Sequence, residues 1–194
     1  MTITIVNLTA PAMRTRMYEA LSIYVQAMGY PTGVEHMRAP LWSEHILRGG
    51  WRAVGAFECP APADIGPHTP LLGIAYGYRG TPAYWWDIQV REGLTHSGAS
   101  RRLLDNYFEL TELHVHPEQQ GRGIGRHLLQ ALLDGRAEDR VLLSTPEVPD
   151  EDNRAWSLYR RLGFQDVLRH FTFRGDQRPF AVLGRELPLP VDPA

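Results

Sequence analysis

Lysine is absent from this sequence: all 20 basic residues are arginine. A biased genomic base composition explains such a replacement, but the chemical consequence holds whatever its cause. Without lysine, the chain has no side-chain amine that could form a Schiff base, bind phosphate in a Gly-Lys-Ser/Thr loop or act as a catalytic base. Three common classes of enzyme site are therefore excluded.

Cysteine is nearly absent as well, since Cys59 is the only one. A single thiol excludes an intramolecular disulfide and a metal cluster held by several thiolates of one chain. Cys59 opens the proline-rich segment 59–70, which reads as a surface loop. We therefore expect its thiol to be inert.

Long apolar runs and a strong net charge are also missing. No stretch approaches the roughly 20 apolar residues that span a bilayer, and the start, Met-Thr-Ile-Thr-Ile-Val-Asn, lacks the basic-then-apolar layout of a signal peptide. The net charge of −2 gives the whole protein no attraction to nucleic acid or to an anionic membrane. We therefore expect a cytoplasmic protein that has neither a nucleic acid nor a membrane as its partner.

The composition is that of a globular protein. Of the 194 residues, 43% are hydrophobic and 22% are charged, which suffices for one domain with a substantial core. Apolar residues spaced by two predict strands, and those spaced by three or four predict helices. We expect strands at 2–6, 51–57, 71–78, 141–144, 167–173 and 180–187, helices at 11–28, 41–47 and 150–162, and a further strand and helix within 109–133.

Turn residues add connections to this pattern. The strands at 51–57 and 71–78 are expected to form an antiparallel hairpin, and the last two strands a second one that turns at Gly175-Asp176. The helix at 150–162 has Asp150 or Asp152 as its candidate N-cap and Gly163 as its stop.

The stretch 80–107 is the least regular part of the chain. It contains Tyr84-Trp85-Trp86, followed by a polar stretch with two glycines. We expect an irregular insertion with some helix around 85–91 and 99–106. The prediction for the whole chain is one mixed α/β domain over 1–187, interrupted by this insertion, with a flexible tail at 188–194.

The segment 109–133 carries most of the functional information. It reads as a strand, a proline-ended turn, a glycine-rich loop and an amphipathic helix whose apolar stripe includes Ile124, Leu128 and Leu132. Such a junction directs backbone N–H groups and the positive end of a helix dipole at one point. The segment therefore predicts an anion site, whose natural ligand is a phosphate or pyrophosphate.

Two familiar phosphate loops can be compared with this segment. The loop of the NTPases requires a lysine, which is missing. In the dinucleotide fingerprint Gly-x-Gly-x-x-Gly, Gly121 and Gly123 fit, but Arg126 occupies the third glycine position. That fingerprint also needs an acidic residue about 20 positions further on, where Asp139 is only weakly placed. Neither nucleotide loop fits the segment.

The spacing that does fit is Gln120-x-x-Gly123-x-Gly125. It resembles the acetyl-CoA signature Arg/Gln-x-x-Gly-x-Gly/Ala of the GNAT superfamily of N-acetyltransferases. A second segment strengthens the resemblance, because Asn153-Arg-Ala-Trp-Ser-Leu-Tyr159-Arg-Arg-Leu-Gly-Phe164 is similar to the superfamily's downstream helix. The two segments and their flanking strands span residues 108–175, and the part before them agrees only in the order of strands and helices.

The resemblance implies both a fold and a reaction. The fold is a mixed α/β one with a central, mostly antiparallel sheet of about six or seven strands, a splayed strand pair and about four helices besides the insertion. The reaction is transfer of the acetyl group of acetyl-CoA to an amine, which attacks the thioester directly in a ternary complex. No covalent acyl-enzyme is needed.

The resemblance also implies which residues hold acetyl-CoA. The pantetheine arm would pair with the strand at Leu113, His114 and Val115, and the backbone N–H of Val115 would polarise the thioester carbonyl. Asn153 would contact the same arm, or else cap its helix. The pyrophosphate would lie against Gln120, Gly121, Arg122, Gly123, Ile124, Gly125 and Arg126, of which the two arginines add side-chain charge or are simply solvated.

The same resemblance implies which residues act as the general acid and the general base. Tyr159 would protonate the departing thiolate, since a phenol ordinarily titrates at about pH 10 and a thiol at about 8.5; otherwise it is a buried helix residue. The base that takes a proton from the acceptor ammonium would be Glu109 or Glu112, with neither preferred over the other, or else neither of the two. Glu109 lies six residues before Val115, whereas Glu112 would point to the opposite face of a regular strand.

The remaining candidates concern the acceptor. His114 and His116 share a strand face but lack a third ligand, so no metal is expected, and His114 is a candidate for the acceptor site. Tyr84-Trp85-Trp86, with Trp42 and Trp51, could wall an acceptor pocket, form the core of the insertion or form a homodimer surface.

The partner is a small-molecule or peptide amine of open identity, a protein lysine included. The alternative function is a non-catalytic acyl-CoA sensor on the same fold.

Overall fold

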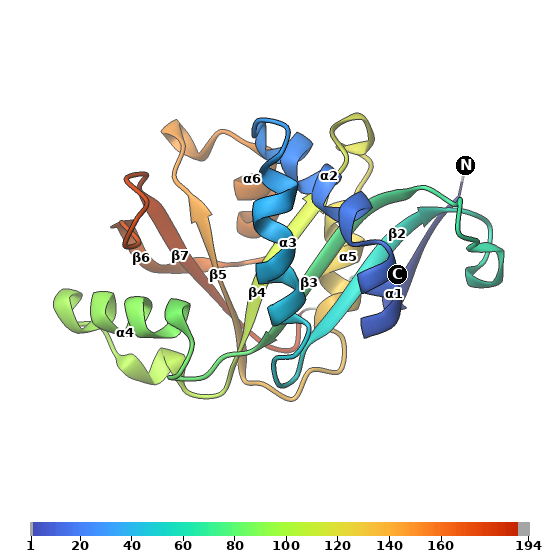
Figure 1. Cartoon of the computed structure of the whole chain (residues 1–194). Coiled ribbons are helices and arrows are strands. Elements are labelled where there is room, and N and C mark those ends of the chain that lie inside the picture. The colour runs from blue at the N-terminus through green and yellow to red at the C-terminus, as the bar shows by residue number, and fades with distance from the viewer. Residues whose placement is uncertain (1, 190–194) are drawn as a thin grey trace. The chain divides into compact units, whose positions relative to one another are not determined.

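Figure 1 shows the computed structural model of the chain, which describes residues 2–189. Most of the predicted tail at 188–194 therefore lies outside the described residues. Seven strands form one mixed sheet in the order β1-β2-β3-β4-β5-β7-β6. The strands are β1 Ile3–Leu8, β2 Arg52–Glu58, β3 Leu71–Arg79, β4 Tyr107–Val115, β5 Arg140–Pro146, β6 Gln165–Phe171 and β7 Phe180–Glu186. The α-helices are α1 Ala10–Thr15, α2 Met17–Met28, α3 Val34–His45, α4 Trp85–Ser97, α5 Ile124–Leu133 and α6 Arg154–Arg161.

The strand pairing confirms the predicted mostly antiparallel, splayed sheet. β1 with β2, β2 with β3, β5 with β7 and β6 with β7 pair antiparallel, so both predicted hairpins are present. β4 and β5 are parallel, and their ladder covers only Tyr107–Glu109 against Arg140–Leu142. Residues 2–189 contain no helix long and apolar enough to cross a membrane.

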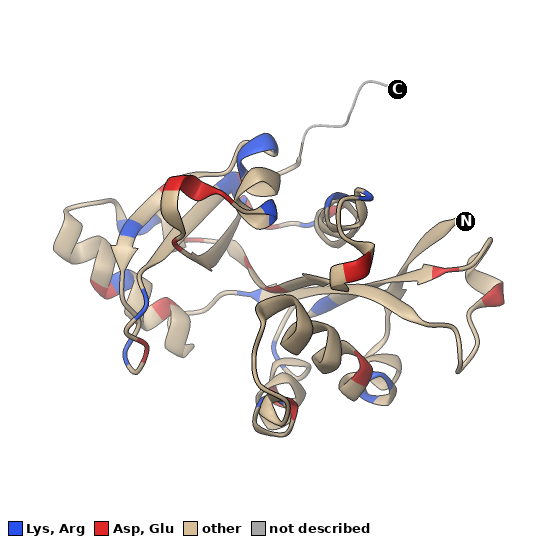
Figure 2. Cartoon of the chain, turned by 90° about the horizontal axis from the view of Figure 1, so that it is seen from above, with Lys and Arg blue, Asp and Glu red and all other residues tan. Residues whose placement is uncertain are grey.

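The chain divides into two compact units, and β4 contributes to both. Unit 1 consists of Met1–Tyr78 and Thr111–Asp134, and unit 2 of Arg79–Leu110 and Gly135–Ala194. Acidic and basic residues are interspersed along the sequence of both units, and Figure 2 shows them spread along the ribbon. Neither unit is therefore a strongly basic or strongly acidic body.

Unit 1 has helices on both faces of its strands. Ile74 and Tyr76 of β3 belong to the same apolar core as residues of α1, α2 and α3. Gly73, on the opposite face, lies against Leu128 of α5, so a Cβ there would come within 3.1 Å of that side chain. The predicted stripe of α5 is confirmed, because Ile124, Leu128, Leu129, Leu132 and Leu133 are all buried.

Unit 2 packs α4 against its strands. Trp86, Val90 and Leu94, four residues apart on α4, share an apolar core with Leu142 of β5 and Val182 of β7. Gly93 lies inside α4 because a Cβ there would come within 2.7 Å of the Phe171 ring. The glycine thus allows close packing of the helix, although in the sequence it suggested an irregular segment.

Several predicted boundaries were wrong. α4 continues to Ser97, and the second helix expected at 99–106 is only a 3₁₀ turn at Arg101–Leu104 before β4. α3 begins at Val34, seven residues earlier than expected, because its exposed first half has little apolar periodicity and Pro40 is tolerated inside it. The helix expected at 11–28 breaks into α1 and α2 at Arg16.

Cys59 also differs from expectation. Although Cys59 follows directly after β2 and opens the loop, its side chain is buried, and its carbonyl accepts a hydrogen bond from Thr4 Oγ1 (2.7 Å).

Candidate functional site

The glycine-rich loop of unit 1 is built as an anion cradle. It runs from the 3₁₀ turn at Pro117–Gln119 to the start of α5, and Gly121 and Gly123 have φ of +82° and +78°. Such left-handed backbone strains a residue with a side chain. A Cβ on Gly121 would meet nothing within 4 Å, and on Gly123 only His127 Cε1 at 3.7 Å. The glycines are therefore required by backbone conformation, and the space in front of them is open.

The start of α5 leaves its N–H groups available to a ligand. Gly123 is the N-cap and supplies no side-chain hydrogen bond to the first turn, which also contains no acidic residue. Gln120 Nε2 donates to the carbonyl of Val115 (3.1 Å), and Arg122 donates to Gln119 Oε1. The first of these contacts ties the loop to the end of β4, and the second lies within the loop segment. The cradle fits a pyrophosphate, because helix N-termini stabilise anions.

Glu112 and His114 form a hydrogen-bonded pair on β4 of unit 1. Being two residues apart on one strand, they share a face, and Glu112 Oε2 lies 2.6 Å from His114 Nε2. The side chains are 16% and 10% exposed, respectively. The ring of Tyr24 on α2 meets the His114 ring edge-on, with centroids 5.0 Å apart. The pair is thus held between β4 and α2, with little contact with water.

The rings around this pair are strongly perturbed. Burial, followed by the Glu112 carboxylate, raises the pKa of Tyr24 far above its ordinary value, with Arg38 acting in the opposite direction. Burial and the Arg48 guanidinium lower the pKa of His45 to about 4, although the Glu112 charge opposes this shift. His45 Nδ1 lies 3.0 Å from the hydroxyl of Tyr76. Neutral rings therefore surround one carboxylate.

The two candidate bases lie in different surroundings. Glu109 belongs to unit 2, is 4% exposed and pairs with Leu142 in the β4–β5 ladder. Glu112 belongs to unit 1 and contacts His114.

The α6 region of unit 2 contains Asn153 and Tyr159. Asn153, not Asp150 or Asp152, is the N-cap, and its Oδ1 accepts a hydrogen bond from the N–H of Trp156 (2.9 Å). The helix therefore begins later than expected, although Gly163 follows its end with φ of +77°, as predicted. Tyr159 is buried on α6 and packs against the Phe164 ring.

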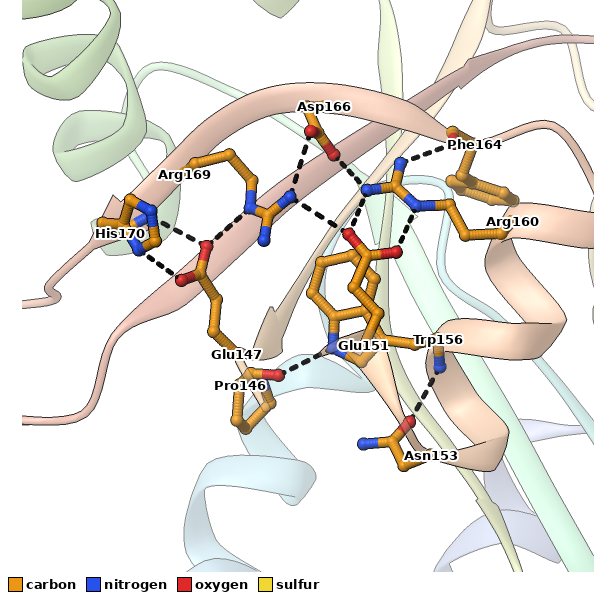
Figure 3. Close-up of polar contacts among 10 residues, drawn as sticks. All are labelled: Pro146, Glu147, Glu151, Asn153, Trp156, Arg160, Phe164, Asp166, Arg169 and His170. Carbon is orange, nitrogen blue, oxygen red and sulfur yellow. Dashed lines mark hydrogen bonds and ion pairs between the residues drawn. The ribbon is translucent and has the colours of Figure 1, made fainter. Parts of the chain in front are cut away.

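An ion network fixes the segment that precedes α6 (Figure 3). Arg160 contacts Glu151 and Asp166, each at 2.6 Å, and Arg169 contacts Glu147 (2.6 Å), Glu151 (3.0 Å) and Asp166 (3.1 Å). We call these five residues the arginine network. Asp150 and Glu151 have positive φ, so the network holds a backbone turn that non-glycine residues rarely adopt.

The aromatic residues considered for the acceptor pocket lie in different surroundings. Trp42 is fully buried and meets Tyr24 and Tyr76 edge-on in unit 1, while Trp51 packs at the margin of the same core. Trp86 is buried in unit 2 and its Nε1 donates to Ser144 Oγ (3.2 Å). Trp85 is 52% exposed and stacks on Phe173. Trp86 thus belongs to the core of the insertion.

Sequence reasoning missed Tyr24 and His45 as site candidates. Their positions on α2 and α3 carry no motif, and their contacts reach β4 and β3 from far away in the chain. Among residues 2–189, no group of three or more His, Cys, Asp or Glu residues is arranged to hold a metal ion.

Comparisons with known proteins agree with the loop and the fold. A family model described as an acetyltransferase (GNAT) domain matches residues 88–166. A "GCN5-like protein acetyltransferase" of Mycobacterium tuberculosis is 51% identical over 97% of this chain and 100% of its own length.

Solved structures show the same fold. Arabidopsis thaliana NAA60 in complex with a bisubstrate analogue has a TM-score of 0.62 and 16% identity, covering 96% of this chain and 100% of its own. The PaiA N-acetyltransferase of Thermoplasma acidophilum in complex with coenzyme A has a TM-score of 0.59 and 16% identity over the same shares of both chains.

Proposed function

Because this chain belongs to the GNAT superfamily of acetyltransferases, we propose that it transfers the acetyl group of acetyl-CoA to an amine of a protein or peptide. The observation that carries this proposal is the relative from M. tuberculosis, which is described as a protein acetyltransferase and aligns along its whole length. The cradle at the start of α5 supports the choice of a pyrophosphate-bearing donor. The chain is in that case an acyltransferase acting in the cytoplasm.

Binding of acetyl-CoA is assigned first to backbone groups. The loop from Gln120 to Arg126 and the dipole of α5 would bind the pyrophosphate, while Leu113, His114 and Val115 would pair with the pantetheine arm; the backbone N–H of Gln120 itself donates to the carbonyl of Pro117 (3.3 Å). Asn153 uses Oδ1 for its helix cap, which leaves its side-chain N–H₂ as the group that donates to the arm. Bound acetyl-CoA supplies a thioester, whose carbonyl oxygen accepts a hydrogen bond from the N–H of Val115.

Proton transfers are assigned to two side chains. Tyr159 donates the proton that the thiolate takes up, because a phenol remains protonated at pH values where a thiol is partly ionised. Of the two carboxylates on β4, we place Glu112, and not Glu109, on the path by which the acceptor ammonium loses its proton. Its side chain contacts an imidazole at 2.6 Å and is more exposed than the buried Glu109, so it serves a proton path better.

The experiment compares two peptides in a thiol-release assay with acetyl-CoA. One has a free lysine and a blocked N-terminus, and the other has a free N-terminus and no lysine. Since the enzyme itself contains no lysine, acetyl-lysine found by mass spectrometry comes from the peptide alone. Tight acetyl-CoA binding without turnover of either peptide or of a panel of small amines would identify a sensor instead.

Tyr159→Phe tests the acid. We expect kcat to fall about 10²-fold or more, the usual contribution of a positioned acid, with little change in the Kd for acetyl-CoA. Unchanged kcat would remove Tyr159 from this role. The matched control is Tyr18→Phe, which removes the hydroxyl of an exposed tyrosine of α2 and should leave kcat unchanged.

A further inference from the structure

We propose that His114, and not a carboxylate acting alone, accepts the proton of the acceptor ammonium, and that Glu112 is the positioning residue that orients the His114 ring. This inference rests on the proposed function and specifies how the acceptor side of that site works. It assigns a base to an imidazole that neither the loop nor the downstream helix indicates.

The geometry of the pair gives the two nitrogens of His114 different tasks. Nε2 lies 2.6 Å from Glu112 Oε2 and donates its proton to that carboxylate. Within the described residues, Nδ1 has no hydrogen-bond partner, so it carries the lone pair that can accept a proton. A carboxylate that fixes the tautomer of an imidazole and stabilises its protonated form is the arrangement of a catalytic dyad.

The chemistry of the acceptor favours an imidazole over a carboxylate. A lysine ammonium ordinarily titrates at about pH 10.4, an imidazole at about 6.5 and a glutamate at about 4.3. Proton transfer to the imidazole is therefore about 100-fold less unfavourable than transfer to the carboxylate. Efficient bases titrate close to the working pH, which is the range of histidine.

The surroundings hold the pair without supplying a competing base. The Tyr24 ring packs edge-on against His114, and the nearby His45 is kept neutral with its Nδ1 against the Tyr76 hydroxyl. Tyr24 stays protonated because burial and the Glu112 charge raise its pKa. The titratable and charged groups that act on these two rings are Tyr30 after α2, Arg38 and Glu44 of α3, Arg48 after α3, and Glu112 itself.

The protons balance in this scheme. The ammonium gives one proton to His114 Nδ1, and the free amine forms the new N–C bond while the C–S bond breaks. The thiolate takes a proton from Tyr159, and the proton that leaves the amide nitrogen restores the tyrosine through solvent. His114 then releases its proton to solvent, so the products are the amide, the free thiol and one proton.

The experiment measures kcat and KM from pH 6 to 9 for the unaltered enzyme, His114→Gln, Glu112→Gln and the double variant, with the lysine peptide as acceptor. We expect His114→Gln to lower kcat about 10²-fold or more near pH 7 without changing the KM for acetyl-CoA. The difference in kcat between His114→Gln and the unaltered enzyme should become smaller as the pH rises, because a larger fraction of the peptide lysine is then already a free amine. The double variant should lose no more than the worse single variant, as residues acting as one unit do.

Controls separate this inference from the proposed function. His68→Gln, in an exposed loop, is the matched control and should leave kcat unchanged. Should His114→Gln unfold, Glu112→Gln with its pH profile still tests the pair. If the unaltered enzyme turns over the peptide while His114→Gln keeps its kcat, or if the two losses are additive, only this inference is overturned. If the unaltered enzyme binds acetyl-CoA but acetylates nothing, the proposed function and this inference both fail.

Discussion

Two polar clusters, one in each unit of the molecule, are built in opposite ways. In the arginine network of unit 2, three carboxylates share two guanidinium groups through short ion pairs. In unit 1, Glu112 stands among rings, namely His114, Tyr24 and His45. The first cluster satisfies its charges and is partly exposed, whereas the second surrounds one charge with groups that accept or donate protons. Carboxylates that all pair with guanidinium groups suit a structural role, whereas a carboxylate that contacts an imidazole suits proton transfer.

The pKa directions express the same contrast. Burial opposes ionisation of Glu147 and Asp166, yet hydrogen bonds from the Arg169 and Arg160 guanidinium groups, with the His170 N–H on Glu147, lower the pKa of both carboxyls. The hydrogen bond from Arg160 also lowers the pKa of Glu151. These groups stay charged at neutral pH. In unit 1, by contrast, burial keeps Tyr24 and His45 neutral.

The largest expected effect comes from exchanging one carboxylate for an amide in each cluster. Glu112→Gln should lower kcat about 10²-fold or more with little loss of stability, since it removes the partner of His114. Glu151→Gln should leave kcat within a few-fold and lower the free energy of unfolding instead, because it weakens contacts of both arginines. The kcat and the free energy of urea unfolding are measured for both variants. Equal losses of kcat in the two variants would contradict the view that only the cluster of unit 1 takes part in the reaction.

The next largest effect is the loss of stability that protonation of His45 causes at low pH. Its pKa is about 4 in the folded protein against about 6.5 in the unfolded chain, so the unfolded chain binds more protons between these values. The stability that His45 contributes is present above pH 6.5 and is lost as the pH falls towards 4, by about 2–3 kcal/mol. Urea unfolding from pH 7 to 5 should therefore show a steeper loss for the unaltered protein than for His45→Gln. Parallel curves would mean that His45 is protonated without cost in the folded state.

The same contrast explains what the sequence could predict. The loop around Gly123 and the segment from Asn153 to Phe164, which contains α6, are local, and their spacing alone indicates the family and predicts the donor. Contacts between distant segments were not predictable: Tyr24 reaches His114 across 90 positions, and Trp86 reaches Ser144 across 58. No spacing rule encodes such pairs.

Errors in the predicted boundaries have the same origin. Asp150 was a candidate cap by composition, but ion pairs with β6 hold the segment before α6 in a turn, and the helix begins only at Arg154, with Asn153 as its N-cap. Likewise Gly93 belonged to a stretch expected to be irregular, whereas it lies inside α4, where the Phe171 ring of β6 packs against it. Helix boundaries predicted from local sequence are therefore wrong where tertiary contacts determine the backbone conformation.

A smaller effect is expected from Arg160→Met. Methionine keeps an apolar stem near the Trp156 ring, over which the Arg160 guanidinium lies at 5.0 Å, but removes the contacts with Glu151 and Asp166. Because the arginine is about one third exposed, we expect a loss of only about 1 kcal/mol in the free energy of unfolding. The difference in the free energy of unfolding between the variant and the unaltered protein should be smaller in 1 M salt than in 0.1 M salt, because salt screens partly exposed ion pairs. A loss that salt does not change would point to packing.

The smallest effect is expected from Asp166→Asn. The Asp166 side chain is 40% exposed, and Arg160 and Arg169 both keep Glu151 when Asp166 is neutralised. The variant should therefore lose no more than about 0.5 kcal/mol at pH 7. Because the pKa of Asp166 is lowered by folding, its contribution exists above the pKa of the unfolded chain and disappears as the pH falls through the folded value. The urea midpoints of the two proteins should thus converge in acid. A large loss at pH 7 would instead show that the arginine network depends on every one of its carboxylates, and that its pairs are not redundant.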